Sequence, residues 1–237
     1  MKIRLDKFLA DCGIGTRSAV KAYIKVGRVT VNQSVAKSPE QKTDPDADEV
    51  CFDGRKLTHE EFQYYMLNKP QGVVSATEDQ REKTVIDLIT EEKRRDLFPV
   101  GRLDKDTEGL LLITNDGKLA NALLAPGKHV DKCYYAELDR EIPEDTAERF
   151  AEGVEIGDDT PTRPAELIML PDGKSARLII TEGRYHQVKR MFEAVGCTVT
   201  YLKRLSMGTL SLDESLVPGA YRRLTEEELR ELKENGK

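Results

Sequence analysis

The segment 110–114 constrains the fold most strongly, because four aliphatic residues and a threonine are followed by the turn sequence Asn-Asp-Gly. A short apolar run bounded by turn residues is typical of a strand buried at the centre of a sheet. Further strands are expected at 64–68, where residues 69–72 break the strand, and at 134–138 and 176–181. Helices are expected at 118–124, 183–195 and 225–234, and the last opens with a capping box of Thr225 and Glu228. This alternation predicts an α+β domain over residues 63–237, with a mixed or antiparallel sheet at its centre and helices beside it.

Residues 1–58 have a different pattern and predict a separate, smaller module. Leu5, Phe8 and Leu9 fall on one face of a short helix. The apolar spacing of residues 16–27 predicts a second helix, which Thr16 or Ser18 can cap. The remaining expected features are short strands at 29–32 and 50–54, an acidic loop at 44–49, and a linker at 59–62 before the larger domain.

The charge of the chain is distributed unevenly. Its net charge of −6 and pI near 5.4 by themselves argue against a nucleic-acid partner. Residues 1–37 nevertheless hold eight basic and two acidic residues, a net +6, whereas residues 38–62 carry a net −5. The basic residues of the second helix recur every four positions and share one face; they are Arg17, Lys21 and Lys25, with Arg28 just beyond. This stripe is either an ordinary solvated face or a surface that contacts phosphates.

Composition argues against several classes of protein. The four cysteines lie far apart with no Cys-x-x-Cys pair, and the chain has three histidines, so no metal site is predicted. The sequence has no nucleotide-binding glycine motif, and no cofactor is expected. No stretch approaches the roughly 18 apolar residues of a membrane span, and the first residues form no signal region. We therefore expect a cytoplasmic protein with free thiols.

The segment 101–110 is the first candidate for chemistry. Arg102 and Asp104 are two residues apart, so in extended chain their side chains point to the same side. A carboxylate at the entrance to a buried strand is a plausible nucleophile or base. The alternatives are a charged surface turn, or a metal site built from Asp104, Asp106 and Asp116.

Two further segments carry candidate residues. Arg184 and His186 stand at the start of the predicted helix 183–195, with Lys189 one turn on, and cations at a helix N-terminus attract a phosphate or a carboxylate. Tyr134 lies in a predicted strand, where an inward ring either packs in the core or stacks on a base in a polar cleft. Taken singly, His186 could equally be structural and Lys189 a solvated flank of the helix.

These segments together resemble a known family. The run Gly101-Arg102-Leu103-Asp104, continued by Thr107 and by residues 109–111, resembles the catalytic signature of the RNA pseudouridine synthases. Further motifs of the family occur in the same order at 66–72, at Lys132 and Tyr134, and at 182–192, while residues 4–32 resemble the S4 RNA-binding domain. The resemblance covers nearly the whole chain, and segments 183–191 and 218–228 are most similar to the small-subunit ribosomal RNA branch, the RsuA type.

The resemblance implies a fold and a reaction. The fold is a small S4 module followed by a catalytic domain with a central sheet flanked by helices. The reaction is the isomerisation of uridine to pseudouridine without a cofactor: the C1′–N1 bond breaks, the uracil turns, and C5 bonds to C1′. The expected substrate is 16S ribosomal RNA, of the uridine 516 type, within an assembling small subunit. The alternatives are a 23S ribosomal RNA substrate, a non-catalytic assembly factor that binds RNA, and a metal-dependent nuclease.

The resemblance also implies roles for individual residues. Asp104 is expected to be the essential carboxylate, Tyr134 to stack on the extruded uracil, and Lys189 to pair with Asp104, with Arg184 as the second candidate for that pairing. Arg102 is expected to help extrude the target nucleotide. The remaining residues expected to contact RNA are Arg184 and His186 in the cleft and Arg17, Lys21, Lys25 and Arg28 in the S4 module. A monomer without metal or small-molecule cofactor is expected.

Overall fold

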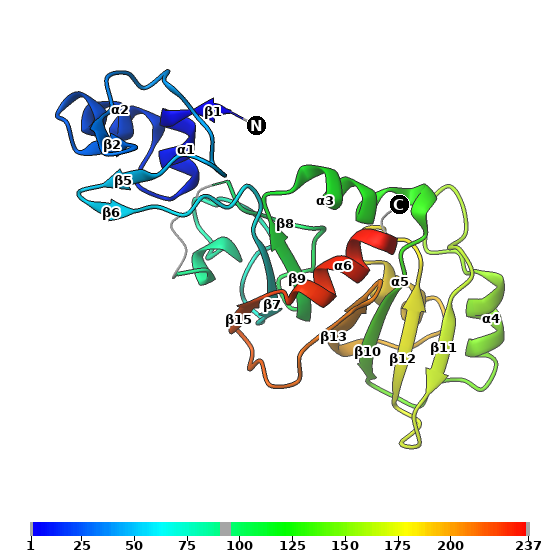
Figure 1. Cartoon of the computed structure of the whole chain (residues 1–237). Helices are drawn as coiled ribbons and strands as arrows, with labels where there is room; N and C mark the ends of the chain where they lie inside the picture. Colours follow the sequence, from blue (N-terminus) through cyan, green and yellow to red (C-terminus); the bar gives the residue numbers. More distant parts are fainter. Residues whose placement is uncertain (1, 91–95, 236–237) are drawn as a thin grey trace. The chain divides into compact units, whose positions relative to one another are not determined.

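The computed structural model describes residues 2–90 and 96–235, which belong to two compact units (Figure 1). The first unit comprises Met1–Gln63 and Ile89–Leu97, and the second comprises Tyr64–Leu88 and Phe98–Lys237. No helix within the described ranges is long and apolar enough to cross a membrane.

The first unit packs two short helices with small antiparallel sheets. Its elements are β1 (Ile3–Arg4), α1 (Leu5–Asp11), α2 (Arg17–Lys25), β2 (Val29–Val31), β3 (Ser34–Val35), β4 (Lys42–Thr43), β5 (Val50–Phe52) and β6 (Arg55–Lys56). The strand order is β3-β2-β5-β6, and β1 pairs with β4. The predicted apolar face of α1 is buried in the core of this unit. Of the two candidate caps of α2, Thr16 and Ser18, the structure uses Thr16, whose hydroxyl accepts a hydrogen bond of 3.2 Å from the Ala19 amide.

The second unit is built on a mixed sheet, as the sequence predicts. Its strands are β7 (Tyr64–Lys69), β8 (Phe98–Pro99), β9 (Glu108–Thr114), β10 (Lys132–Leu138), β11 (Glu166–Met169), β12 (Ser175–Ile180), β13 (Val199–Met207), β14 (Leu210–Ser211) and β15 (Tyr221–Arg223). The main order is β11-β12-β10-β13-β9-β7-β15. Among the named strands of this unit in the described part of the chain, the pairings are antiparallel except that of β9 with β13, which is parallel.

The helices of this unit cover the sheet and complete its core. They are α3 (Gly117–Leu124), α4 (Thr146–Glu152), α5 (Gln187–Glu193) and α6 (Glu226–Asn235), with single 3₁₀ turns at Ile86–Leu88 and Pro126–Lys128. Side chains of α3 and α6 pack in one apolar cluster with residues of β7, β9 and β13, so both helices cover the same face (Figure 1). The predicted capping box of the last helix is present, because Thr225 and Glu228 exchange two hydrogen bonds.

The helix predicted at 183–195 is shorter than expected. It begins at Gln187, because His186 adopts a left-handed conformation with φ of 48°. The preceding residues are held outside the helix by side-chain contacts: the Gln187 carboxamide accepts a hydrogen bond from the Arg184 amide and donates one to Glu182. The prediction was also wrong at Lys69, which is the last residue of β7 rather than part of the break after it. The long strand β13 and the helix α4 were not predicted.

Gly109 marks the closest approach of two strands in the second unit. It has a φ of 102°, and a Cβ at this position would lie 2.2 Å from the carbonyl oxygen of Arg204 on β13. Only glycine fits here, since an added side chain would meet backbone that cannot move aside. This contact fixes the start of β9, and therefore the loop 101–107 that precedes it.

We expect Gly109→Ala to destabilise the protein by about 3 kcal/mol or more, through backbone strain and a clash with β13. The measurement is urea unfolding followed by circular dichroism. Gly117→Ala is the matched control, because nothing lies within 4 Å of a Cβ there and its φ is ordinary. Equal stability of the two variants would contradict the close packing of β9 on β13.

Candidate active site

The second unit contains a small open cleft of about 70 Å³, lined by segments that are far apart in the sequence. The loop between β8 and β9 forms one side, β10 and β13 contribute the floor, and the start of α5 forms the other side. All six candidate residues of the predicted catalytic domain line this cleft: Arg102, Asp104, Tyr134, Arg184, His186 and Lys189.

Asp104 lies between two basic side chains of the opposite wall. Its Oδ2 is 3.1 Å from the Lys189 ammonium, and its Oδ1 is 3.5 Å from Nε2 of His186. The Asp104 side chain is 28% exposed, so a substrate can reach it while part of its surface is shielded from water. Asp104 and Lys189 therefore form an ion pair at the cleft, and an ion pair is stronger where water is partly excluded.

Lys189 bridges two carboxylates. Its ammonium is 2.7 Å from Oδ1 of Asp106 as well as 3.1 Å from Asp104. Burial alone would lower the pKa of Lys189, but the hydrogen bonds to Asp106 and Asp104 outweigh burial and raise that pKa above its ordinary value. The same contact lowers the pKa of Asp106. Lys189 is therefore a permanent cation beside Asp104 at neutral pH.

Tyr134 and Arg102 differ in burial. Tyr134 is 7% exposed on β10 and lines the cleft, so its ring is shielded from solvent except towards that space. Arg102 is exposed at the cleft, and its side chain makes no hydrogen bond or ion pair recorded among the described residues. Tyr134 is placed for contact with a flat apolar group in the cleft. Arg102 is free to move towards a bound ligand.

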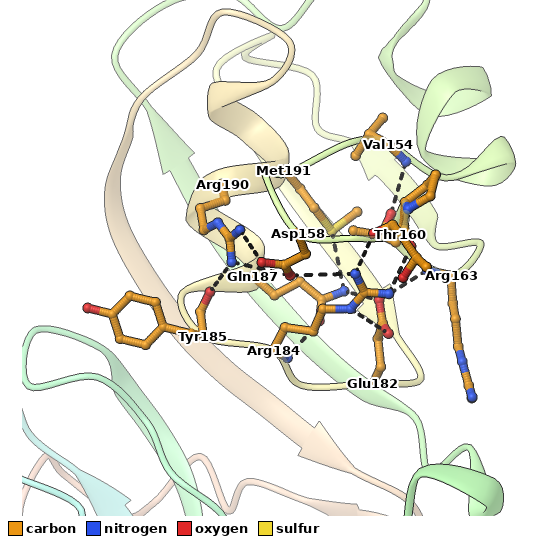
Figure 2. A network of polar contacts seen from close by, with 12 residues as sticks. Val154, Asp158, Thr160, Arg163, Glu182, Arg184, Tyr185, Gln187, Arg190 and Met191 are labelled. Atoms are coloured by element: carbon orange, nitrogen blue, oxygen red, sulfur yellow. Dashed lines mark hydrogen bonds and ion pairs between the residues drawn. The ribbon is translucent and has the colours of Figure 1, made fainter.

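The guanidinium of Arg184 is used in contacts with other residues of the protein (Figure 2). Its guanidinium donates to Glu182 at 3.1 Å, to the Thr160 carbonyl at 2.7 Å and to the Pro161 carbonyl at 2.8 Å. It also lies 3.5 Å from Asp158. Lys189, rather than Arg184, therefore makes the contact with Asp104. Arg184 holds the loop at 158–161 against the segment that leads into α5.

Lys69 is a site residue to which the sequence patterns gave no role. Its side chain is fully buried, and its ammonium donates to the carbonyls of Thr107 at 2.8 Å, Pro70 at 3.0 Å and Lys105 at 3.3 Å. Two of these acceptors belong to the loop that carries Asp104. Burial lowers the pKa of Lys69 to about 8, and the nearby carboxylates of Asp106 and Asp104 oppose that shift. A lysine directly before proline at a strand end was the signal available in the sequence.

Lys69→Met is expected to lower kcat about 10- to 100-fold with little change in KM, since the loop that carries Asp104 loses its support.

The same variant predicts a pH dependence of stability. The pKa of Lys69 is about 8 in the folded protein and ordinarily 10.5, so between pH 8 and 10.5 the unfolded chain binds the Lys69 proton more tightly than the folded protein does. The stability of the wild type relative to Lys69→Met therefore rises as the pH increases from about 8 towards 10.5, which urea unfolding measures. Lys105→Met, on the same loop with an exposed contact to Glu82, is the control and should change neither quantity. A flat stability difference across this range would contradict the burial of a charged Lys69.

The basic residues of the first unit have two different environments. Arg17, Lys21 and Lys25 are exposed along α2 and share one face, as predicted. Arg28 is paired with Asp53 and lies over the rings of Tyr23 and Phe52, 4.7 and 4.5 Å from their centroids. The first three are therefore the more accessible cations for a phosphate chain.

Asp116 does not contribute to the cleft. Its Oδ1 accepts hydrogen bonds from the amides of Lys118 and Leu119, and its Oδ2 accepts one of 2.8 Å from the Tyr64 hydroxyl. It caps α3, a common role for aspartate at that position. Within residues 2–90 and 96–235, no group of three or more His, Cys, Asp or Glu is arranged to hold a metal ion. The hypothesis of a metal site from Asp104, Asp106 and Asp116 therefore lacks its third ligand.

Comparison with protein-family models finds a match over the catalytic unit and another near the N-terminus. The model for RNA pseudouridylate synthase matches residues 63–194, more than half of the chain, and the model for the S4 domain matches residues 3–48. The chain belongs to the RNA pseudouridine synthases. It is accordingly an isomerase, and its fold is an S4 domain followed by a pseudouridine synthase domain.

Relatives of this pseudouridine synthase match over nearly their whole length. An uncharacterized RNA pseudouridine synthase of Bacillus subtilis is 51% identical, covering 98% of this chain and 99% of the relative. Ribosomal small subunit pseudouridine synthase A of Escherichia coli is 42% identical, covering 96% and 98%. A solved structure of a pseudouridylate synthase aligns with a TM-score of 0.69 at 40% identity, covering 97% of this chain and 99% of that one.

Proposed function

We propose that this pseudouridine synthase isomerises a single uridine of small-subunit ribosomal RNA, of the uridine 516 type in 16S RNA, within an assembling subunit in the cytoplasm. The observation that carries the proposal is the placement of Asp104 between Lys189 and His186 in a cleft whose floor includes Tyr134. Similarity over nearly the full length to enzymes named ribosomal small subunit pseudouridine synthase A supports the choice of RNA.

Asp104 is the proposed catalytic carboxylate, and it acts on the sugar or the base of the bound uridine. Rearrangement requires that the C1′–N1 bond breaks and that C5 joins C1′, with the hydrogen at C5 released to solvent and a proton taken up at N1. The ammonium of Lys189, 3.1 Å away, stabilises the negative charge of Asp104 between turnovers. Tyr134 provides a flat apolar surface that holds the uracil while it turns.

The target base must leave its stack to reach the cleft, because a stacked base hides its reacting atoms. Arg102, exposed at the cleft, is the proposed residue that fills the vacated space in the RNA. Arg184 and His186, proposed from the sequence as RNA contacts, stand on the opposite wall. In this proposal His186 faces the substrate, and Arg184 acts by holding that wall in place.

The S4 module, proposed as residues 1–58 and joined by 59–62 to a catalytic module at 63–237, adds affinity for the phosphate backbone. The exposed cations of α2, with Arg28 beside them, are the proposed contacts. Such contacts position the RNA without selecting a base, so selection is left to the cleft. We propose that the enzyme acts as a monomer.

The test is tritium release from 5-tritiated uridine in ribosomal RNA, because isomerisation frees the hydrogen at C5. The substrates are 16S and 23S transcripts, each naked and bound to ribosomal proteins. We expect release from 16S RNA that saturates at one equivalent per molecule. Release only from 23S RNA would show that the substrate is large-subunit RNA rather than small-subunit RNA. No release from any of the four substrates would contradict catalysis on ribosomal RNA.

A further inference from the structure

Tyr185 is an exposed aromatic residue at the edge of the cleft. Its side chain is 73% exposed, the highest fraction among the large hydrophobic side chains within the described ranges. Its ring stacks on the ring of His186, with centroids 3.8 Å apart and an angle of 20° between planes. His186 lines the cleft and approaches Asp104 at 3.5 Å, so the stacked pair extends from the catalytic carboxylate towards solvent.

The backbone at Tyr185 is held in place from both sides. Its carbonyl accepts a hydrogen bond of 3.0 Å from Arg190, which is also bound to Asp158 at 2.6 Å. The neighbouring Arg184 is bound to Glu182 and to the loop at 158–161. Figure 2 shows the Tyr185 ring directed away from this network. A fixed backbone that presents an aromatic ring to water offers a binding surface at low entropic cost.

We propose that Tyr185 stacks on the base next to the target uridine and replaces the stacking that this base loses when the uridine is extruded. The inference rests on the proposed function, because it takes a single uridine drawn into the cleft as its starting point. Extrusion leaves the neighbouring base with one bare face, and that face lies at the mouth of the cleft. Aromatic side chains bind bases in this way regardless of base identity.

The surroundings favour RNA as the occupant of this surface. Arg102 is exposed at the cleft and has no ion pair with any described residue, so it places a positive charge there that suits a phosphate chain. Tyr185 and His186 form one narrow stack rather than a broad apolar patch, and a stack of this width matches a single base. The structure thus divides recognition in two: Tyr134 contacts the reacting uracil, and Tyr185 contacts its neighbour.

The experiment uses the full-length chain and a 16S RNA fragment that carries 2-aminopurine directly 5′ or directly 3′ of the target uridine. Stacking quenches the fluorescence of this base analogue. Binding is followed in Asp104→Asn protein, in which turnover is expected to be at least about 10³-fold slower. The values of kcat and KM are measured by tritium release in protein with Asp104 intact. The variants are Tyr185→Leu, which removes the ring, and Tyr185→Phe, which retains it. Tyr135→Leu is the control, since Tyr135 lies on the other face of β10 from Tyr134 and does not line the cleft.

We expect the protein with Tyr185 to quench one of the two probes, and Tyr185→Leu to lose that quenching with about tenfold weaker binding and an unchanged kcat. Tyr185→Phe and Tyr135→Leu should retain the quenching and the wild-type affinity. Equal quenching and affinity in Tyr185→Leu, or no quenching of either probe with Tyr185 present, would overturn the proposal. The proposed function is tested separately: if no tritium is released while quenching still depends on Tyr185, the assigned reaction or target fails and the stacking surface stands.

Discussion

Asp104→Asn is expected to lower tritium release by at least about 10³-fold while the protein remains folded and binds RNA with equal or higher affinity. The substitution keeps the shape of the side chain and removes only its charge and basicity. Lys189 retains its contact with Asp106 at 2.7 Å, so no buried cation is left without a partner. The substitution should therefore lower kcat rather than weaken RNA binding. Single-turnover release at saturating RNA measures it, and circular dichroism checks the fold.

Asp106→Asn is the matched control for this prediction. Asp106 lies two residues further on and contacts the same lysine, but its side chain is 69% exposed and does not line the cleft. We expect a loss of less than about tenfold, because an exposed ion pair contributes little. If Asp106→Asn abolished release and Asp104→Asn did not, the catalytic carboxylate would be Asp106, and our assignment would be wrong.

Lys189→Met is expected to reduce kcat by about 10²- to 10³-fold. The variant leaves Asp104 and Asp106 close together without the cation that now separates them. The thioether side chain has a similar length, so the packing of α5 should be retained. Lys189→Arg keeps the positive charge and is expected to stay within about tenfold of the wild type. Equal losses in the two variants would mean that the shape of lysine matters rather than its charge.

The same variant gives a pH dependence with a definite sign. Lys189 holds the pKa of Asp106 below its ordinary value of 3.8, so this pair stabilises the fold above that pH and the contribution is lost as the pH falls through the lowered pKa. In Lys189→Met the contribution is absent at every pH. The stability difference between wild type and variant should therefore shrink as the pH falls below about 4, and NMR titration should show the Asp106 pKa rising towards 3.8.

Local patterns in the sequence determined most of the elements. The buried strand at 110–114 and the capping box of Thr225 with Glu228 were predicted correctly, and the cap of α2 was narrowed to Thr16 or Ser18, of which the structure uses Thr16. Each of these features depends on residues within a few positions of one another. Family resemblance then selected Asp104, Tyr134 and Lys189 from among many charged and aromatic residues, and the structure places all three in one cleft. Their catalytic roles stay predictions until the variants are measured.

Only the tertiary structure showed how distant segments meet. Lys189 contacts Asp106 across 83 positions of sequence, and the parallel pairing of β9 with β13 at Gly109 has no local signal. Two further features depend on neighbours that the chain brings together only when folded. They are the burial of Lys69 and the hydrogen bonds of Arg184 to the loop at 158–161. The physical reason is that periodicity and caps encode which face of an element is buried, whereas the partner of each side chain follows from strand order and register, which are fixed by packing of the whole sheet.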